Sequence, residues 1–277
     1  MKHWFLTFLL FLTVGTAYSQ NLPSFQQNRK YLDLNSHYGR GGAPDSVPSG
    51  FIFSEGSRVN GIKNGNSING THNGSYRVIE EDGIHYLLIV WNDNSQDKYL
   101  IIGQIRNGYF TFFNLYNKDG IPFFNTGTIP SEEWITFHPN IISAEDISAS
   151  SELREGSIVY STNNLDDRTG VCWAARGGIG EKIIIRKGLQ GDLSISTGFI
   201  SYEKPYLYRQ NSRPKKIRIS YEGDNPKIVE LADTYHFQTI DSSGFYEKDV
   251  WIEILEVYPG TRYNDTCVNF FRKYYIQ

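Results

Sequence analysis

Several features that would assign this chain to a familiar class are scarce or missing. The 277 residues include one Met and two Cys, and beyond the first twenty residues no segment is apolar enough to cross a membrane. Basic residues are not in excess, since 27 Lys and Arg face 30 Asp and Glu, a net charge of −3 at pH 7. Nucleic acids and anionic membranes attract strongly positive surfaces, so we expect neither nucleic-acid binding nor membrane insertion.

Catalytic signatures are missing as well. The chain has no H-E-x-x-H, no G-x-S-x-G, no P-loop and no G-x-G-x-x-G, and its six His are scattered. The glycine-rich residues 177–180 lead into a predicted strand and not into a helix, which makes them a poor phosphate cradle. We therefore expect a protein that is not an enzyme, with no metal site and no cofactor.

The first twenty residues have the three parts of a secretory signal peptide. Lys2 is followed by the apolar residues 4–14 (WFLTFLLFLTV), and Ala17 and Ser19 are small residues of the kind that precede a cleavage site. The residue directly after the predicted cleavage is not Cys, so a lipid anchor of the bacterial lipoprotein kind is not expected. The sequence predicts a signal peptide at residues 1–19 and a secreted or periplasmic protein; a buried N-terminal helix is the alternative.

Aromatic residues and glycine are plentiful, with 19 Tyr, 17 Phe and 26 Gly. This composition favours strands over helices. Aromatic side chains pack well on half-buried sheets, and they also stack against sugar rings. Composition alone favours the packing interpretation.

Apolar and turn-forming segments alternate at about ten-residue spacing between residues 51 and 130. Four strands are predicted here, at residues 75–79, 84–91, 98–104 and 109–116. Turns of Asn, Asp and Gly join them, which indicates an antiparallel meander or small barrel of no recognised family. Residues 20–50, rich in Gly, Pro and Ser, are predicted to be a flexible lead-in, and residues 131–150 a linker with one helical stretch.

Strand and turn signals become dense in residues 151–277. About seven or eight strands are predicted, six of them at residues 182–186, 193–200, 215–219, 227–231, 236–240 and 250–257. Seven or eight strands in about 120 residues are typical of a jelly-roll β-sandwich. The predicted fold class is therefore all-β, with a meander or small barrel followed by a sandwich.

Four segments of this half resemble one family in the same order. Residues 163–173 (NNLDDRTGVCW) resemble its N-x-F-D-G…T-A-W, residues 178–181 reproduce its G-I-G-E, and residues 196–217 resemble N-G-Y…Y…N-x-R-x-K-K-I. Residues 233–267 resemble D-T…F-Q…V-Y-P-G-T-K-Y-D-D-T-C. This half is similar to the NADase-type glycan-binding (translocation) domain of the discoidin, or galactose-binding-like, superfamily. That resemblance implies a discoidin-like sandwich that recognises glycan.

The chain also departs from the family pattern. Asp166-Asp167 replaces Asp-Gly, Thr197-Gly198-Phe199 replaces N-G-Y, and the terminal C-I-S-E-I becomes residues 267–271 (CVNFF), which removes an acidic residue. Most matching residues are expected to form the scaffold: a core tryptophan, a sharp glycine turn and two side-chain-to-backbone turns. These are Trp173, Gly178, Gly180, Asp233 and Asp265.

The candidates for sugar contact lie mainly on the connection at residues 201–213. Sugar binding needs an aromatic plane for the apolar ring face and fixed polar groups for the hydroxyls, and loops at one end of a sandwich often carry function. The expected glycan-binding residues are Arg176, Tyr202, Tyr206, Tyr208, Asn211 and Arg213. A solvated basic loop with packed tyrosines is the alternative.

Cys172 and Cys267 are either a disulfide, which an oxidising compartment permits, or two buried thiols. The bond is favoured because the resemblance implies neighbouring first and last strands. The resemblance also allows a structural calcium, for which no ligands are assignable. The predicted function is an exported, bacterial-type carbohydrate-binding protein whose C-terminal domain recognises a glycan or surface polysaccharide. The alternative is an extracytoplasmic interaction or structural module without sugar binding.

Overall fold

A computed structural model describes most of the chain from residue 73 onward and parts of the chain before it. The described residues are 30–32, 50–54, 58–63, 66–67, 73–106, 109–120, 122–125, 140–165, 170–186, 192–221, 225–241 and 248–274. Most of them lie in strands and few in helices, which confirms the all-β class. The leader at residues 1–19 and the helical stretch near residue 132 lie outside the described residues.

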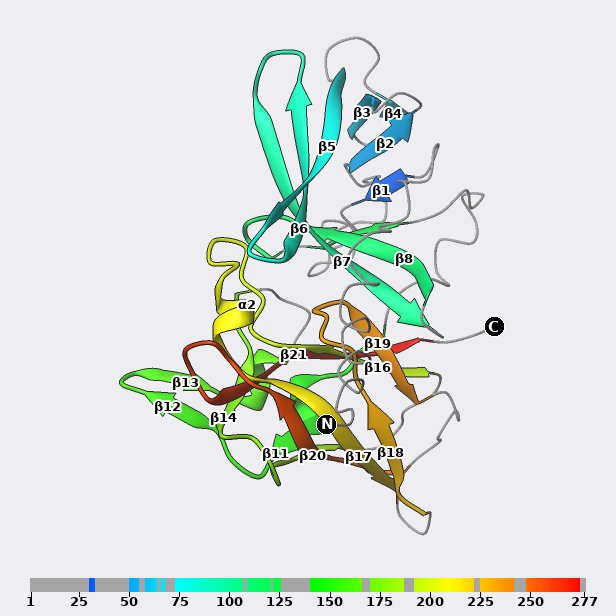
Figure 1. The fold of residues 1–277 in the computed structure, drawn as a ribbon. Coiled ribbons are helices and arrows are strands. Elements are labelled where there is room, and N and C mark those ends of the chain that lie inside the picture. The colour runs from blue at the N-terminus through cyan, green and yellow to red at the C-terminus, as the bar shows by residue number, and fades with distance from the viewer. Residues whose placement is uncertain are drawn as a thin grey trace, which may run out of the picture.

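The N-terminal half is an antiparallel barrel, as the meander pattern predicted (Figure 1). The pairing runs β7-β6-β5-β3-β2-β1-β9-β8 and closes because β8 also pairs with β7, while β4 (Asn66–Ser67) pairs only with β3. The ring consists of β1 (Lys30–Leu32), β2 (Gly50–Ser54), β3 (Arg58–Lys63), β5 (Asn73–Glu81), β6 (Ile84–Trp91), β7 (Gln96–Arg106), β8 (Tyr109–Tyr116) and β9 (Pro122–Asn125).

Side chains alternate between the two faces of the barrel wall, as the pleat of a strand requires. Leu87 and Ile89 of β6 pack in one cluster with Phe53, whereas Ile84 and Tyr86 belong to a second cluster that contains residues of the C-terminal half. This double burial explains why β6 is an apolar run without polar alternation.

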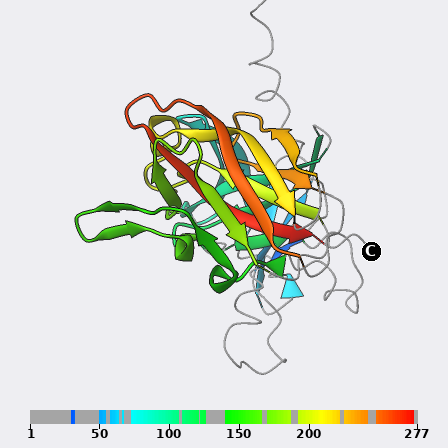
Figure 2. The same ribbon diagram turned by 90° about the horizontal axis from the view of Figure 1, so that it is seen from below.

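The C-terminal half is a sandwich of two sheets. One sheet contains β10 (Asn140–Ile141), β14 (Trp173–Arg176), β16 (Asp192–Thr197), β19 (Phe237–Asp241) and β21 (Asp265–Tyr274). The other has the order β11 (Ile147–Ala149), β15 (Lys182–Ile185), β20 (Val250–Tyr258), β17 (Arg213–Tyr221) and β18 (Lys227–Glu230). A hairpin of β12 (Leu153–Glu155) and β13 (Ile158–Tyr160) projects from the sandwich (Figure 2). Two 3₁₀ turns, η2 (Ala144–Asp146) and η3 (Thr162–Asn164), flank β11 and β13.

A continuous sheet joins the barrel to the sandwich. The first part of β7 pairs with β6, and its last part pairs in parallel with β19, where Phe237 lies opposite Gln104. The Gln104 side chain strengthens this junction by donating to the hydroxyls of Ser194 (3.0 Å) and Thr239 (2.9 Å). The two halves are therefore one body and not two modules on a flexible tether.

Both halves also contribute to one apolar core. Arg272 is buried within it, and its guanidinium carbon lies 4.3 Å from the ring centroid of Phe237. The buried members from the barrel are Ile84, Tyr86, Leu100, Ile102 and Tyr116, and those from the sandwich are Ile200, Tyr208, Tyr235, Phe237 and Phe270. Burial of aromatic area on this scale makes the junction a major source of stability.

The domain boundaries differ from those predicted at two places. Lys30–Leu32, within the expected lead-in at residues 20–50, is a barrel strand that pairs with β2 and β9. The described part of the expected linker, residues 140–150, belongs to the sandwich, because β10 pairs with β21 and β11 with β15. Short strands of two or three residues carry too little periodicity to be recognised in sequence.

His236 makes the junction sensitive to acid. Its Nδ1 accepts from the backbone N of Gly103 (3.0 Å), and burial together with neighbouring His85 lowers the pKa of His236 to about 3. In the unfolded chain this His has its ordinary pKa of 6.5 and binds a proton below that pH, whereas in the folded chain it stays neutral until about pH 3. The contribution of His236 to the free energy of unfolding is therefore fully present above pH 6.5 and declines below it, by about 2 kcal/mol at pH 5.

Urea denaturation between pH 7 and pH 5 checks this expectation. Asn at position 236 keeps an acceptor oxygen and does not titrate, so the His236→Asn variant should lose most of the pH dependence. Asp233, whose folded pKa is below its ordinary value, contributes only below about pH 4. An unchanged slope in the His236→Asn variant would show that another group is responsible.

Candidate functional site

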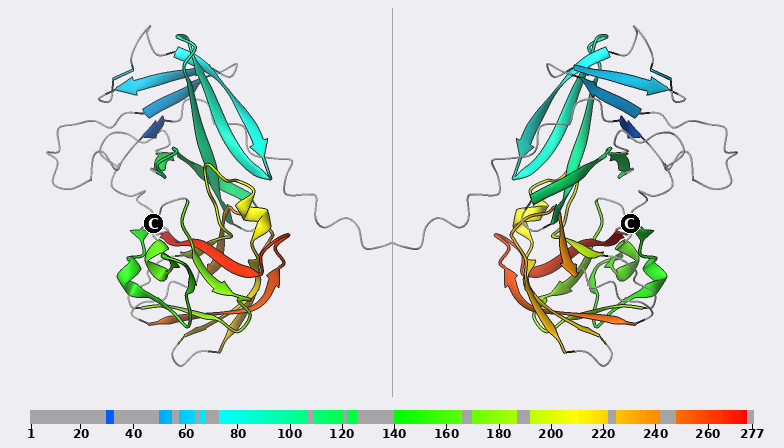
Figure 3. Two further views of the ribbon diagram at one scale, coloured as in Figure 1. Left: turned by 90° about the vertical axis from the view of Figure 1, so that its left-hand side faces the viewer. Right: turned by 90° about the vertical axis from the view of Figure 1, so that its right-hand side faces the viewer.

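The connection at residues 201–213 is built around one carboxylate. It carries the short helix α2 (Leu207–Gln210), which lies between the barrel and the sandwich (Figure 3). Arg213 donates from Nε to Asp233 Oδ1 (2.7 Å) and from Nη2 to Oδ2 (3.1 Å), and the Tyr208 hydroxyl donates to Oδ1 (3.1 Å). Arg209 adds a bond from Nη1 to Oδ2 (2.9 Å). Two guanidinium groups and a phenol therefore converge on Asp233.

Burial completes this cluster. Arg213 is 4% exposed and Tyr208 is 1% exposed, and the remaining Nη1 of Arg213 donates to the carbonyls of Tyr208 and Asn211. Burial acts to raise the pKa of Asp233, but the hydrogen bonds and charge of Arg213 hold that pKa below its ordinary value. The carboxylate is thus ionised at neutral pH and neutralises a buried guanidinium.

These contacts correct part of the predicted site. Tyr208, Asn211 and Arg213 were expected to contact a sugar, yet all three are buried and bonded within the chain; the Asn211 amide donates to the Leu207 carbonyl (2.9 Å). Asp233 was expected to form a side-chain-to-backbone turn, and it is an ion-pair partner instead. Sequence shows which polar residues a loop contains but not the direction in which they point.

Tyr202 belongs to the junction with the barrel. Its hydroxyl donates to the Lys98 carbonyl (2.8 Å), its own carbonyl accepts from the Tyr86 hydroxyl (3.2 Å), and the Lys98 ammonium lies over both tyrosine rings. The predicted sugar contact at Tyr202 is therefore replaced by a contact between the halves.

Tyr206 and Arg176 are the two predicted residues that remain exposed. Tyr206 precedes α2 and is 41% exposed, and Arg176 ends β14 opposite Asp265. Between them lies the β20–β21 connection, whose residues Thr261 and Tyr263 donate backbone N–H groups to the carbonyls of Arg209 and Gln210. The Gly177 N–H in turn donates to the Asn264 carbonyl (3.2 Å). We call α2 with Tyr206, residues 259–264 and residues 176–180 the loop-end surface.

The loop-end surface contains two further residues suited to ligand contact. Tyr263 is 36% exposed, and the guanidinium carbon of Arg262 lies 5.1 Å from its ring centroid. In the sequence, both residues stand out only as part of the segment that resembles the family. The signal that could have identified them is an Arg-Tyr pair between Pro259-Gly260 and the strand that begins at Asp265, because such a position is an exposed turn.

A family match covers the same half. Residues 140–271 match the family model described as NAD glycohydrolase translocation F5/8 type C domain. The C-terminal half is a domain of this discoidin-like kind. The match confirms the resemblance seen in the sequence and, by beginning at residue 140, agrees with the earlier start of the sandwich. Comparison with curated proteins gives no match for the chain.

The other scaffold predictions for the F5/8 type C domain can be compared with the structure one by one. Trp173 is fully buried and donates from Nε1 to the Ser151 carbonyl (2.9 Å), as expected of a core anchor. Gly178 has φ +72°, and a Cβ there would lie 2.2 Å from Thr266 Oγ1, so this turn requires glycine. Gly180 also has positive φ, whereas Asp265 begins β21 and does not form a turn.

The two cysteines are buried free thiols and not the favoured disulfide. They lie on adjacent strands, since Cys267 is opposite Ala174 and Cys172 precedes β14 by one residue. Burial raises the pKa of the Cys172 thiol, and contact with Cys267 acts in the same direction.

This arrangement predicts slow thiol chemistry. The native protein should resist alkylation by iodoacetamide, and the protein unfolded in urea without reductant should gain two alkyl groups by mass spectrometry. If the unfolded protein gains none, the residues are bonded.

The described residues contain neither a helix that could span a membrane nor a cluster of metal-ligating side chains. No helix in these ranges is long and apolar enough to cross a membrane. In the same part of the chain, no group of three or more His, Cys, Asp or Glu is arranged to hold a metal ion.

Proposed function

We propose that this protein is exported and binds glycan through the loop-end surface of its F5/8 type C domain. The match of residues 140–271 to that discoidin-like module carries the proposal. The chemistry of the surface supports it, because Tyr206 and Tyr263 present exposed aromatic faces while Arg176 and Arg262 supply donors for hydroxyl or carboxylate groups.

The cluster around Asp233 supports this role indirectly. It fixes α2, and the carbonyls of Arg209 and Gln210 in turn fix the β20–β21 connection. A binding surface held in one conformation loses less conformational entropy when a ligand binds. The buried residues thus position the exposed ones and do not contact the ligand.

A glycan array probed with the full chain tests the proposal. The full chain is required because barrel and sandwich share a core. Binding of at least one surface polysaccharide, weakened about tenfold or more in a Tyr206→Ala/Tyr263→Ala variant, is the expected result. Tyr76→Phe, which changes a barrel tyrosine far in sequence from the loop-end surface, is the matched control. A folded chain that binds no glycan would favour the structural or protein-interaction role.

A further inference from the structure

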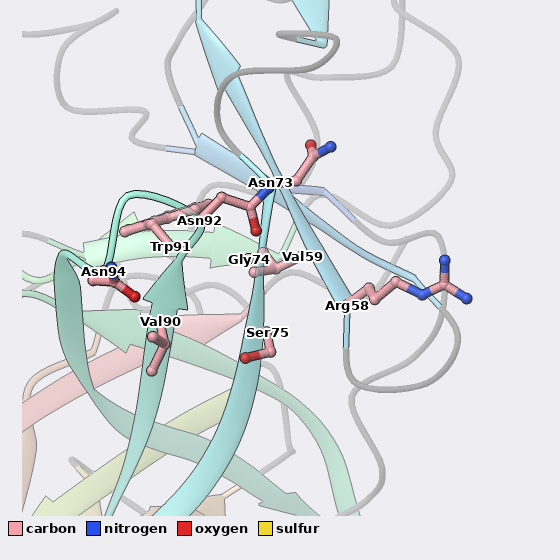
Figure 4. Close-up of a pocket in the computed structure, with 9 residues that line it drawn as sticks. All are labelled: Arg58, Val59, Asn73, Gly74, Ser75, Val90, Trp91, Asn92 and Asn94. Carbon is pink, nitrogen blue, oxygen red and sulfur yellow. The ribbon is translucent and has the colours of Figure 1, made fainter.

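The barrel has a hollow at one end that lies outside the F5/8 type C domain. Its volume is about 580 Å³, and it forms where β3 and β5 begin and where β6 turns into β7. The lining residues are Arg58, Val59, Asn73, Gly74, Ser75, Val90, Trp91, Asn92 and Asn94 (Figure 4). Ends of barrels are common places for ligand sites.

Trp91 is the aromatic member of this lining. It is half-buried, packs against the inner barrel cluster, and its Nε1 donates to Asp97 Oδ2 (2.7 Å), which fixes the orientation of the ring. Gly74 pairs with both Trp91 and Val59 on the neighbouring strands, so the position between these two apolar side chains has no side chain. A Cβ at Gly74 would lie 2.5 Å from the Val90 carbonyl oxygen, so glycine allows β5 to approach β6 closely next to the fixed indole.

A rigid turn carries the polar groups next to Trp91. Asp93 Oδ1 accepts from both the backbone N and the hydroxyl of Ser95, and Asn94 has the left-handed φ of +66°. Asn92 is tied to β5 by its N–H, which donates to the Asn73 carbonyl (2.9 Å). The side-chain amides of Asn73, Asn92 and Asn94 make no hydrogen bond to other described residues, so they are free to bind a ligand.

An indole ring beside several amides on a fixed turn matches the chemistry of an uncharged sugar. The ring face of a pyranose is apolar and stacks on an aromatic plane, while each amide offers both a donor and an acceptor to vicinal hydroxyls. Among the lining residues that the structure describes, none is acidic, and Arg58 extends away from Trp91 on the other side of β5 (Figure 4). We propose that this hollow is a second saccharide site, specific for neutral glycans and separate from the loop-end surface.

Fluorine NMR of the full chain labelled with 5-fluorotryptophan tests the site directly. A Trp91→Phe variant assigns the Trp91 signal. The probes are laminarihexaose, cellohexaose, xylohexaose and maltohexaose at millimolar concentration. At least one should shift the Trp91 signal in a saturable manner while the signals of Trp173, which is fully buried, and Trp251, on the distant sheet of the sandwich, stay unchanged.

Two variants separate binding from folding. Trp91→Leu keeps apolar bulk but removes the aromatic plane, and Asn94→Gly keeps the left-handed turn but removes one amide; each should weaken binding about tenfold. Asn264→Ala, an exposed amide of the loop-end surface, is the matched control and should leave the affinity of the hollow unchanged.

The outcomes distinguish this site from the proposed function. Lack of any Trp91 response to all four oligosaccharides, or equal affinity in the Trp91→Leu and Asn94→Gly variants, overturns the second site and leaves the loop-end proposal intact. A Trp91 response that persists in the Tyr206→Ala/Tyr263→Ala variant supports a site independent of the loop-end surface.

Discussion

Replacing Asp233 with Asn is expected to lower the free energy of unfolding by about 3 kcal/mol. The carboxylate neutralises Arg213, which is 4% exposed, and also accepts from Tyr208 and Arg209. Removing one partner of a buried ion pair leaves an uncompensated charge, which typically costs about 3–5 kcal/mol. We expect the lower end because the Asp233 side chain is itself 28% exposed. Urea denaturation of the full chain at pH 7 measures the change.

The contribution of burial can be separated from that of charge. Arg209, whose side chain is 48% exposed, bonds to the same carboxylate, and Arg209→Ala should cost less than about 1 kcal/mol. Arg218→Ala removes an ion pair with Glu253 on the adjacent strand of the same sheet and should also have a small effect. Equal losses in the Asp233→Asn and Arg209→Ala variants would contradict a cluster centred on buried Arg213.

Replacing Phe237 with Ala is expected to destabilise the chain by about 3–5 kcal/mol, the usual cost of emptying a buried aromatic position. Phe237 is 1% exposed, lies 5.1 Å from Phe270 between ring centroids, and forms the parallel pair with Gln104 of the barrel. Because the cavity opens in a core that both halves share, unfolding should remain a single transition with a lower midpoint in urea.

Ile228→Ala provides the matched control for this experiment. Ile228 lies on edge strand β18, is 51% exposed, and its truncation should change stability by no more than about 0.5 kcal/mol. Two separate transitions in the wild-type chain, followed by fluorescence and by far-ultraviolet circular dichroism, would show that barrel and sandwich unfold independently. That result would contradict the shared core.

Much of the barrel could be predicted from the sequence because its strands are long and separated by clear turns. The predicted boundaries of β6 and β8 agree with the structure to the residue. The joining of the two halves could not be predicted, since a parallel pairing between β7 and β19 connects residues more than a hundred positions apart. No local pattern encodes such a contact.

The structure gives a physical reason for one departure from the family pattern, at Phe270. The family has an acidic residue at this position, and the phenylalanine here is fully buried between Tyr116 of the barrel and Phe237. An acidic side chain would be costly in that apolar core. The substitution thus fits a sandwich whose face is covered by a barrel, although the sequence alone showed only that a charge was lost.

The candidate site was predicted with less success for a physical reason. A loop with several Tyr, Arg and Asn can direct its polar groups outward to a ligand or inward to its own backbone, and the residue types are the same in both cases. Asp233, twenty residues after Arg213, decides the direction by offering a carboxylate to that side chain. Only Tyr206 and Arg176 of the predicted residues remain on the surface.

Isothermal titration calorimetry of the full chain with the glycan that binds best on the array tests the central claim most directly. Wild type is compared with the Tyr206→Ala/Tyr263→Ala variant, which retains Arg213. Urea denaturation first checks that the two proteins have the same free energy of unfolding. We expect saturable binding by the wild type and a dissociation constant raised about tenfold or more in the variant. Equal affinity of the two proteins would place the glycan elsewhere and contradict binding at the loop-end surface.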